Sequence, residues 1–225
     1  MRSIALSLCI LAVGLSSGLA SAGTISFTGT FSTDDQLEIF IFTAPTSSFV
    51  AQTWSYAGGT NGAGAGIPAG GFNPVLSLFD ATGGLTASSP FVADNDDNPA
   101  AAIDPTTGNA FDSLLSISTL ISGDTYALIL SESDNLPYGG TYGAGFPDTG
   151  VGNFTAAEFG CSGTAPFCDP STLQRTGNWA VDISGVGSAI DISASGTGVP
   201  EPGSIILLSA GLAGLTLLRR RGKRT

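Results

Sequence analysis

Short stretches of alternating polar and apolar residues, separated by clusters of Gly, Asn, Asp and Pro, run through most of this 225-residue chain. Successive side chains of a β-strand point to opposite faces of a sheet, so alternation with a period of two predicts strands that bury one face. Of the 32 glycines, 26 lie between residues 23 and 199, where they favour tight turns and oppose helices. The stretches that we predict as strands are residues 25–31, 37–43, 48–56, 75–79, 114–117, 126–131, 179–183 and 188–193.

Several short strands with turn signals between them are typical of an all-β fold. We therefore predict an antiparallel β-sandwich of the jelly-roll kind over residues 23–198, a length that suits one domain with a substantial core. The Gly-rich stretches 57–71 and 136–152 are expected to be long loops.

The charged residues are distributed very unevenly. Arg175 is the only base between residues 23 and 199, whereas 17 of the 18 acidic residues lie there, which gives this segment a formal charge of −16. Such a segment will not bind nucleic acid through its phosphates, which requires clustered Lys and Arg. The chain has no His, and no Lys before Lys223, so catalytic triads, Schiff-base lysines and the commonest zinc and haem ligands are also excluded.

Residues 1–22 have the composition of a targeting segment. A basic start is followed by an apolar run from Ile4 to Leu19 and by small residues at Ala20 and Ala22. This order predicts a secretory signal peptide that is cleaved after Ala22, and an N-terminal membrane anchor is the alternative. Cys9 lies within the apolar run and would leave with the signal peptide.

The other end of the chain carries three features in succession. Pro200, Glu201 and Pro202 precede an uncharged stretch, residues 203–218, which five basic residues follow. As a helix this stretch would be about 24 Å long, shorter than the ~30 Å hydrocarbon core of a bilayer. We predict a single short apolar helix that spans the membrane with help from snorkelling arginines, with its basic end in the cytoplasm and the preceding domain outside.

These three features, in this order over residues 199–225, resemble the PEP-CTERM sorting signal of Gram-negative bacteria. The resemblance implies recognition by an exosortase-type membrane transpeptidase and an intermediate anchored in the inner membrane. It also implies a final place at the cell surface or outside the cell, in association with exopolysaccharide or biofilm. An ordinary single-pass anchor after a Pro-rich linker is the alternative.

Cys161 and Cys168 are the cysteines that remain in an exported protein. Export favours a disulfide between them, which would staple a surface loop. A tetrahedral metal site would need further Cys or His ligands, and a redox site would need closer spacing.

Three segments of the central region, residues 31–42, 72–97 and 120–130, resemble the bacterial pre-peptidase C-terminal (PPC) domains and their PPC-like relatives. The first is an acidic turn that enters an alternating strand, the second is a strand followed by Asp80 and a later acidic run, and the third is a strand preceded by Gly123. The resemblance implies a calcium-associated β-sandwich of a secreted protein. Asn73 stands where many relatives carry Asp, so no ligand is carried over to that position.

Oxygen-bearing side chains cluster at the end of the second of these segments, with three carboxylates in four residues. Ca²⁺ takes six to eight oxygen ligands and tolerates irregular geometry, and the carboxylates would repel one another without a cation. A Ca²⁺ site is therefore predicted, and a solvated acidic turn is the alternative. The predicted ligands are Asp35, Asp80, Asp94, Asp96, Asp97 and Asn98, with Asp34 and Asp104 beside them.

Carboxylates are also the only residues that could serve as a general acid and base. Glu38 and Glu132 lie on predicted strands, where we expect them to face outward, and Glu158 lies in a predicted loop. A glycan hydrolase would use two such groups, but no spacing in the sequence brings two of them together. The prediction is that the protein is not an enzyme.

Aromatic residues suggest a second class of function. Trp54 and Trp179 lie on predicted strands and are expected in the core, whereas Tyr138 and Tyr142 stand among glycines in a predicted loop. Exposed tyrosines of this kind could contact sugar rings. The sequence thus predicts a non-enzymatic exported surface or matrix protein, and the alternative is a carbohydrate-binding module that uses Tyr138 and Tyr142.

Overall fold

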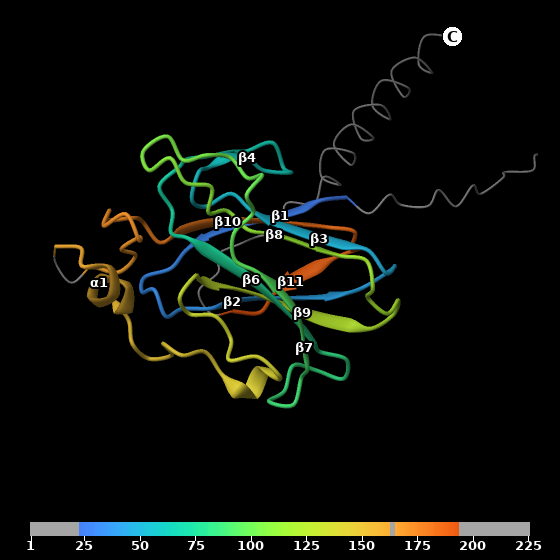
Figure 1. Ribbon diagram of the computed structural model, residues 1–225. Coiled ribbons are helices and arrows are strands. Elements are labelled where there is room, and N and C mark those ends of the chain that lie inside the picture. The colour runs from blue at the N-terminus through green and yellow to red at the C-terminus, as the bar shows by residue number, and fades with distance from the viewer. Residues whose placement is uncertain (1–22, 163–164, 194–225) are drawn as a thin grey trace, which may run out of the picture.

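The computed structural model describes residues 23–162 and 165–193, and this part of the chain is mostly β-structure in antiparallel sheets (Figure 1). It contains almost no helix. The predicted all-β, antiparallel character is therefore confirmed. The predicted signal peptide and C-terminal helix lie outside the described residues.

One sheet has four antiparallel strands. Its order is β1 (Ile25–Thr30), β10 (Asn178–Ser184), β3 (Phe49–Thr53) and β8 (Leu114–Ile117). Gly29 of β1 is paired with Trp179 of β10, and a Cβ at Gly29 would lie 2.3 Å from Cζ2 of that indole. A glycine inside this strand therefore makes room for the tryptophan.

The other sheet has five antiparallel strands. Its order is β11 (Ala189–Asp191), β2 (Glu38–Thr43), β9 (Thr125–Glu132), β6 (Pro74–Asp80) and β7 (Phe91–Asn95). The pairing of β6 with β7 shifts register between Leu78 and Phe79, where a β-bulge occurs.

Side chains from both sheets meet in a single hydrophobic core. Phe27 of β1 and Phe40 of β2 have ring centroids 4.7 Å apart, and Phe42 of β2 and Phe49 of β3 are stacked at the same distance. Each pair joins the four-stranded sheet to the five-stranded sheet. Figure 1 shows β1, β10 and β3 above β2, β9 and β7.

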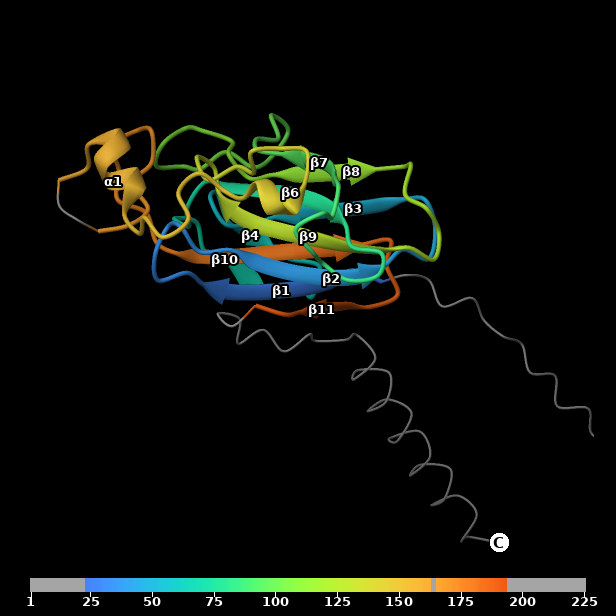
Figure 2. The ribbon, with the colours of Figure 1, turned by 90° about the horizontal axis from the view of Figure 1, so that it is seen from below.

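The central strands β6 and β9 are buried on both faces, which explains their continuous apolar sequences. Leu128 and Leu130 face the shared core, whereas Ala127 and Ile129 belong to a second cluster with Phe79. The segment 136–152, which contains the 3₁₀ helix η1 (Tyr142–Ala144), covers this outer face beside β6 and β9 (Figure 2). It was predicted as a loop and serves as part of the covering layer.

The predicted strands are all present, with small differences at their ends. The largest difference is at β3, which was predicted to reach residue 56 and ends at Thr53. The carboxylate of Asp112 accepts hydrogen bonds from the N–H groups of Ser55, Tyr56 and Ala57 at 2.6, 3.1 and 2.9 Å, so these groups leave the sheet. A side chain 59 residues beyond Thr53 in the sequence thus sets the end of the strand.

Four short elements were not predicted from the sequence, and β7 lies where an acidic loop was predicted. Strands β4 (Gly59–Thr60) and β5 (Gly66–Ile67) form a small hairpin inside the predicted loop 57–71. Helix α1 (Phe154–Phe159) has only six residues, flanked by Asn153 and Gly160 in the left-handed conformation, and is too short for a helical period to show. None of the helices within residues 23–162 and 165–193 is long and apolar enough to cross a membrane.

Candidate functional site

Acidic side chains gather at one end of the five-stranded sheet, where β2 and β6 begin and β7 and β9 end. Several of them influence one another's ionisation although they come from distant parts of the sequence. We call this region the acidic end. Its members are Asp34, Asp35, Asp94, Asp96, Asp97, Glu132, Asp134, Asp148 and Glu158.

Asp96 is a member of the acidic end with a strongly raised pKa. Burial, followed by the charges of Asp97, Asp134 and Asp94, raises its pKa to about 7. Its Oδ1 atom is buried and accepts no hydrogen bond from any residue that the structure describes. Ser113 holds this turn, because its hydroxyl lies within hydrogen-bonding distance of the main-chain oxygens of Asn95, Asp96 and Pro74 and can donate its one proton to any of them.

The end of β9 supplies a second group of carboxyls. Glu132 is only 2% exposed, and burial, opposed by the N–H of Asp134 at 3.0 Å, raises its pKa well above the usual range. Burial also raises the pKa of Asp134, Asp148 and Glu158, with nearby carboxylates adding to the effect. The surroundings at this end of the domain therefore disfavour the charged form of these carboxyls.

Asp34 and Asp35 approach the same region from the link between β1 and β2. Asp34 is fully buried and accepts hydrogen bonds from the N–H groups of Asn153 and Thr155 and from the Thr155 hydroxyl, the last at 2.6 Å. Asp35 accepts one from the N–H of Gly150 at 3.0 Å. These carboxylates hold the segment around α1 against the sheet.

The structure brings together only some of the predicted Ca²⁺ ligands. Asp96 lies with Asp94 and Asp97, whereas Asp80 lies at the opposite end of β6, where it accepts a hydrogen bond from the N–H of Thr82 at 2.8 Å. The Asn98 side chain instead accepts a hydrogen bond from the N–H of Ala100. Within the described residues, no three or more carboxylate or thiol groups are arranged to hold one metal ion.

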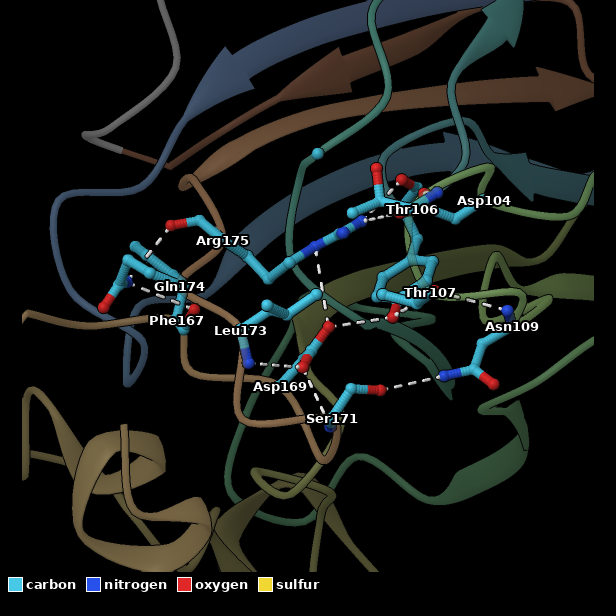
Figure 3. Close-up of polar contacts among 12 residues, drawn as sticks. Asp104, Thr106, Thr107, Asn109, Phe167, Asp169, Ser171, Leu173, Gln174 and Arg175 are labelled. Atoms are coloured by element: carbon cyan, nitrogen blue, oxygen red, sulfur yellow. Dashed lines mark hydrogen bonds and ion pairs between the residues drawn. The ribbon is translucent and has the colours of Figure 1, made fainter. Parts of the chain in front are cut away.

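Arg175 organises a separate polar cluster (Figure 3). It is 7% exposed, and its Nη2 lies 2.5 Å from Asp104 Oδ2 while its Nε lies 3.9 Å from Asp169 Oδ2. The guanidinium donates to the carbonyl oxygens of Gly71 and Tyr56 at 3.0 and 2.8 Å, and its carbon lies 3.9 Å from the centre of the Tyr56 ring. This single base joins three loops at one end of the domain.

The charged and polar groups of this cluster have partners within it, as expected for a structural role. Burial of Asp104 raises its pKa, but the N–H of Thr106 and the guanidinium of Arg175 outweigh that effect and leave it below the usual value. Burial, assisted by Asp169, raises the pKa of Tyr56, whose hydroxyl donates to Asp169 at 2.9 Å. Asp104, considered beside the predicted Ca²⁺ ligands, thus pairs with a guanidinium.

The carboxylates considered for catalysis do not lie as expected. Glu38 is completely buried and Glu132 nearly so, so the expectation that both face outward was wrong. Glu38 lies opposite Leu130 in the ladder of β2 with β9, and Glu132 lies opposite Pro74 in the ladder of β6 with β9. Both glutamates are therefore at the end of the five-stranded sheet where the acidic side chains gather. Glu158 is exposed, and it lies on α1 rather than in a loop.

The aromatic candidates differ in how exposed their side chains are. Tyr138 is 71% exposed, whereas Tyr142 is half-buried and packs edge-on against Phe79 with ring centroids 5.7 Å apart. Trp179 lies in the core as expected, but Trp54 is half-buried beyond the end of β3. Trp54 borders a depression on the outer face of the four-stranded sheet. The strand pattern could not indicate this depression, because Thr60 at the end of β4 and Asn61 just beyond it form its wall.

The predicted disulfide is confirmed. Cys161 and Cys168 are bonded, and Cys168 is 1% exposed. The N–H of Cys168 donates to the Thr155 hydroxyl at 2.9 Å, so the disulfide is connected through Thr155 to buried Asp34.

Comparison with known proteins identifies one segment. Residues 198–221 match the PEP-CTERM protein-sorting motif. This match confirms the sorting-signal part of the resemblance, and it indicates export through a membrane-anchored intermediate and an exosortase-type processing partner. The matched residues lie outside the part of the chain that the structure describes. No curated protein matches this chain.

Proposed function

We propose that this chain is a non-enzymatic exported protein whose β-domain is delivered to the cell surface or the extracellular matrix. The observation that carries the proposal is the sorting motif over residues 198–221, which contains Pro200, Glu201 and Pro202. The disulfide between Cys161 and Cys168 supports it, because such bonds persist in oxidising compartments. Association with exopolysaccharide or biofilm is part of the proposal.

The finer description of the fold belongs to the same proposal. We infer a β-sandwich of the jelly-roll or PPC-like type over residues 23–198. It is supported by the core that the two antiparallel sheets share.

The role we propose is one of binding or scaffolding rather than catalysis. Two candidate carboxyls, Glu38 and Glu132, are buried at the sheet end, and the third, Glu158, is exposed on a six-residue helix. A hydrolytic pair must face a shared substrate cleft. A glycan hydrolase thus has less support here than a surface protein.

The test is the mass of the exported product in the native host. Intact-mass analysis of the surface or secreted fraction should find a chain that begins at Gly23 and lacks the apolar and Arg-rich residues of the tail. Deletion of the exosortase-type transpeptidase, or a Glu201→Ala change, should leave the tail attached. A mature product that still carries residues 205–225 in the parent strain would contradict the processing step.

Ca²⁺ binding at the acidic end is a second proposal, favoured by the buried, unpartnered Oδ1 of Asp96 beside Asp94, Asp97 and Asp134. The carboxylates would need to move toward one ion, because no group of three is so arranged among the described residues. A cation that binds the folded state preferentially raises the melting temperature. Adding millimolar Ca²⁺ to the EDTA-treated chain should raise it, and the double change Asp96→Ala/Asp97→Ala should abolish the rise. An equal rise in that variant, or no rise in the parent, would reject the site.

A further inference from the structure

We propose that the depression beside Trp54 binds a neutral polysaccharide, with one sugar ring stacked on the indole. It lies on the outer face of the four-stranded sheet and has a volume of about 210 Å³. Pockets for drug-sized ligands measure roughly 300–1,000 Å³, so this open depression suits one ring of a chain that continues across the surface. The inference rests on the proposed function only for the presence of polysaccharide around the protein.

Two kinds of surface form the depression. Val50 and Gln52 of β3 and Asp182 of β10 form its floor, because their side chains point away from the core. Thr60 and Asn61, at and just beyond the end of β4, form a wall that stands above the sheet.

The indole of Trp54 is held in a fixed position at this site. Its Nε1–H donates to Asp182 Oδ2 at 2.7 Å. Gly59 of the hairpin lies against the ring, since a Cβ at that position would lie 2.7 Å from Cε3. An aromatic ring that is already oriented loses little conformational freedom when a flat ligand packs on it.

The polar groups around the indole suit hydroxyl groups. The Gln52 side chain makes no hydrogen bond with other described residues, so its amide offers both donors and an acceptor. Asn61 Oδ1 already accepts from the N–H of Ala65 at 2.8 Å, which leaves its amide nitrogen to donate, and the Thr60 side chain is exposed. Donors and acceptors placed beside an apolar ring are what a sugar requires, because its faces carry C–H groups and its edge carries hydroxyls.

Charge selects a neutral polysaccharide over an acidic one. Asp182 accepts hydrogen bonds from the Ser26 hydroxyl at 2.5 Å, the N–H of Gly62 at 2.7 Å and Trp54, so a carboxylate lies in the floor of the depression. None of the described residues that line the depression is a Lys or an Arg. A uronate or sulfate group placed there would meet a carboxylate without any compensating base.

The experiment uses the full chain in detergent, with a soluble β-glucan and a galactomannan as neutral probes and alginate as the acidic probe. The protein contains only two tryptophans, and Trp179 is 2% exposed, so a change in fluorescence on titration reports on Trp54. Retardation in polysaccharide-containing native gels gives an independent affinity. Melting temperature confirms that each variant is folded.

We expect at least one neutral probe to bind and Trp54→Ala to weaken that binding by about tenfold or more. Gln52→Ala, which removes no internal hydrogen bond, should weaken it by about fivefold. Tyr138→Ala is the matched control and should leave affinity unchanged. The proposal is overturned if neither neutral probe binds, if only alginate binds, or if Tyr138→Ala rather than Trp54→Ala removes binding. None of these outcomes changes the mass of the exported product, so failure here is distinct from failure of the proposed sorting.

Discussion

Replacement of Asp96 by Asn should stabilise the protein at neutral pH. In the folded state the pKa of Asp96 is raised from 3.8 to about 7, so its carboxyl keeps its proton where the unfolded chain has already lost it. A group with a raised folded pKa contributes its stabilisation below pH 4 and loses it as the pH rises toward 7. A single such group costs about 1.4 kcal/mol for each pH unit in this window, or ~4 kcal/mol in all.

Asp96 is half-buried, so solvent screening reduces this figure, and we take about half of it, ~2 kcal/mol, as the expected gain at pH 7.5. For a domain of this size that corresponds to a melting temperature higher by about 4–8 °C. At pH 4 the variant and the parent should melt together, because both then carry a neutral side chain at position 96.

The assay is thermal and urea unfolding of both proteins in EDTA from pH 4 to pH 8. Asp94→Asn is the matched control, since Asp94 is exposed on β7 and its change removes the same charge two residues away. The control should gain less than the Asp96 variant. The reasoning is refuted if Asp96→Asn gives no gain at pH 7.5, or if its gain is the same at pH 4 and pH 7.5.

Three further changes probe the rest of the fold. Arg175→Met should cost about 3–5 kcal/mol in urea unfolding, because it leaves buried carboxylates without their cation, and a loss below 1 kcal/mol would contradict a structural role. Replacing Cys161 and Cys168 together by Ala should cost about 2–3 kcal/mol through the entropy of the unfolded loop, measured against the oxidised parent, with an unchanged stability as the opposing result. Gly29→Ala should lower stability by about 1–3 kcal/mol, because its Cβ would lie 2.3 Å from the facing indole. Gly66→Ala, where a Cβ has open space, should have little effect, and equal losses in the two variants would contradict the packing argument.

The local sequence pattern was sufficient to place eight of the eleven strands within the described residues, but it did not indicate β4, β5 and β7. Alternation placed β8 at residues 114–117, where the structure has it, because one face of that strand contacts the core and the other does not. The two-residue strands β4 and β5 carry almost no pattern, so the wall of the Trp54 depression could not be predicted. The position of a strand is a local property, whereas a surface depression depends on which loops lie over the sheet.

Charged residues were harder to place than apolar ones. Glu38 was expected to face outward from its strand, because a carboxylate is seldom buried, but the tertiary structure buries it completely. Asp96 and Asp134 are 38 residues apart in the sequence, and their interaction arises because β7 and β9 both end beside the start of β6. The acidic run around Asp96 was visible in the sequence, but its partners were not.

The burial of Arg175 bears on how this protein resists trypsin-like proteases. Within the described residues it is the only side chain after which a trypsin-like protease can cut, and it is 7% exposed and tied to main-chain oxygens of two loops. Such a protease reaches the bond only when the loops open, so cleavage there follows the population of opened molecules. The domain also has no lysine, because no lysine occurs before Lys223. It therefore offers no side-chain amine for cross-linking. Proteolytic cleavage of the chain after Arg175 would therefore report local unfolding of this part of the domain.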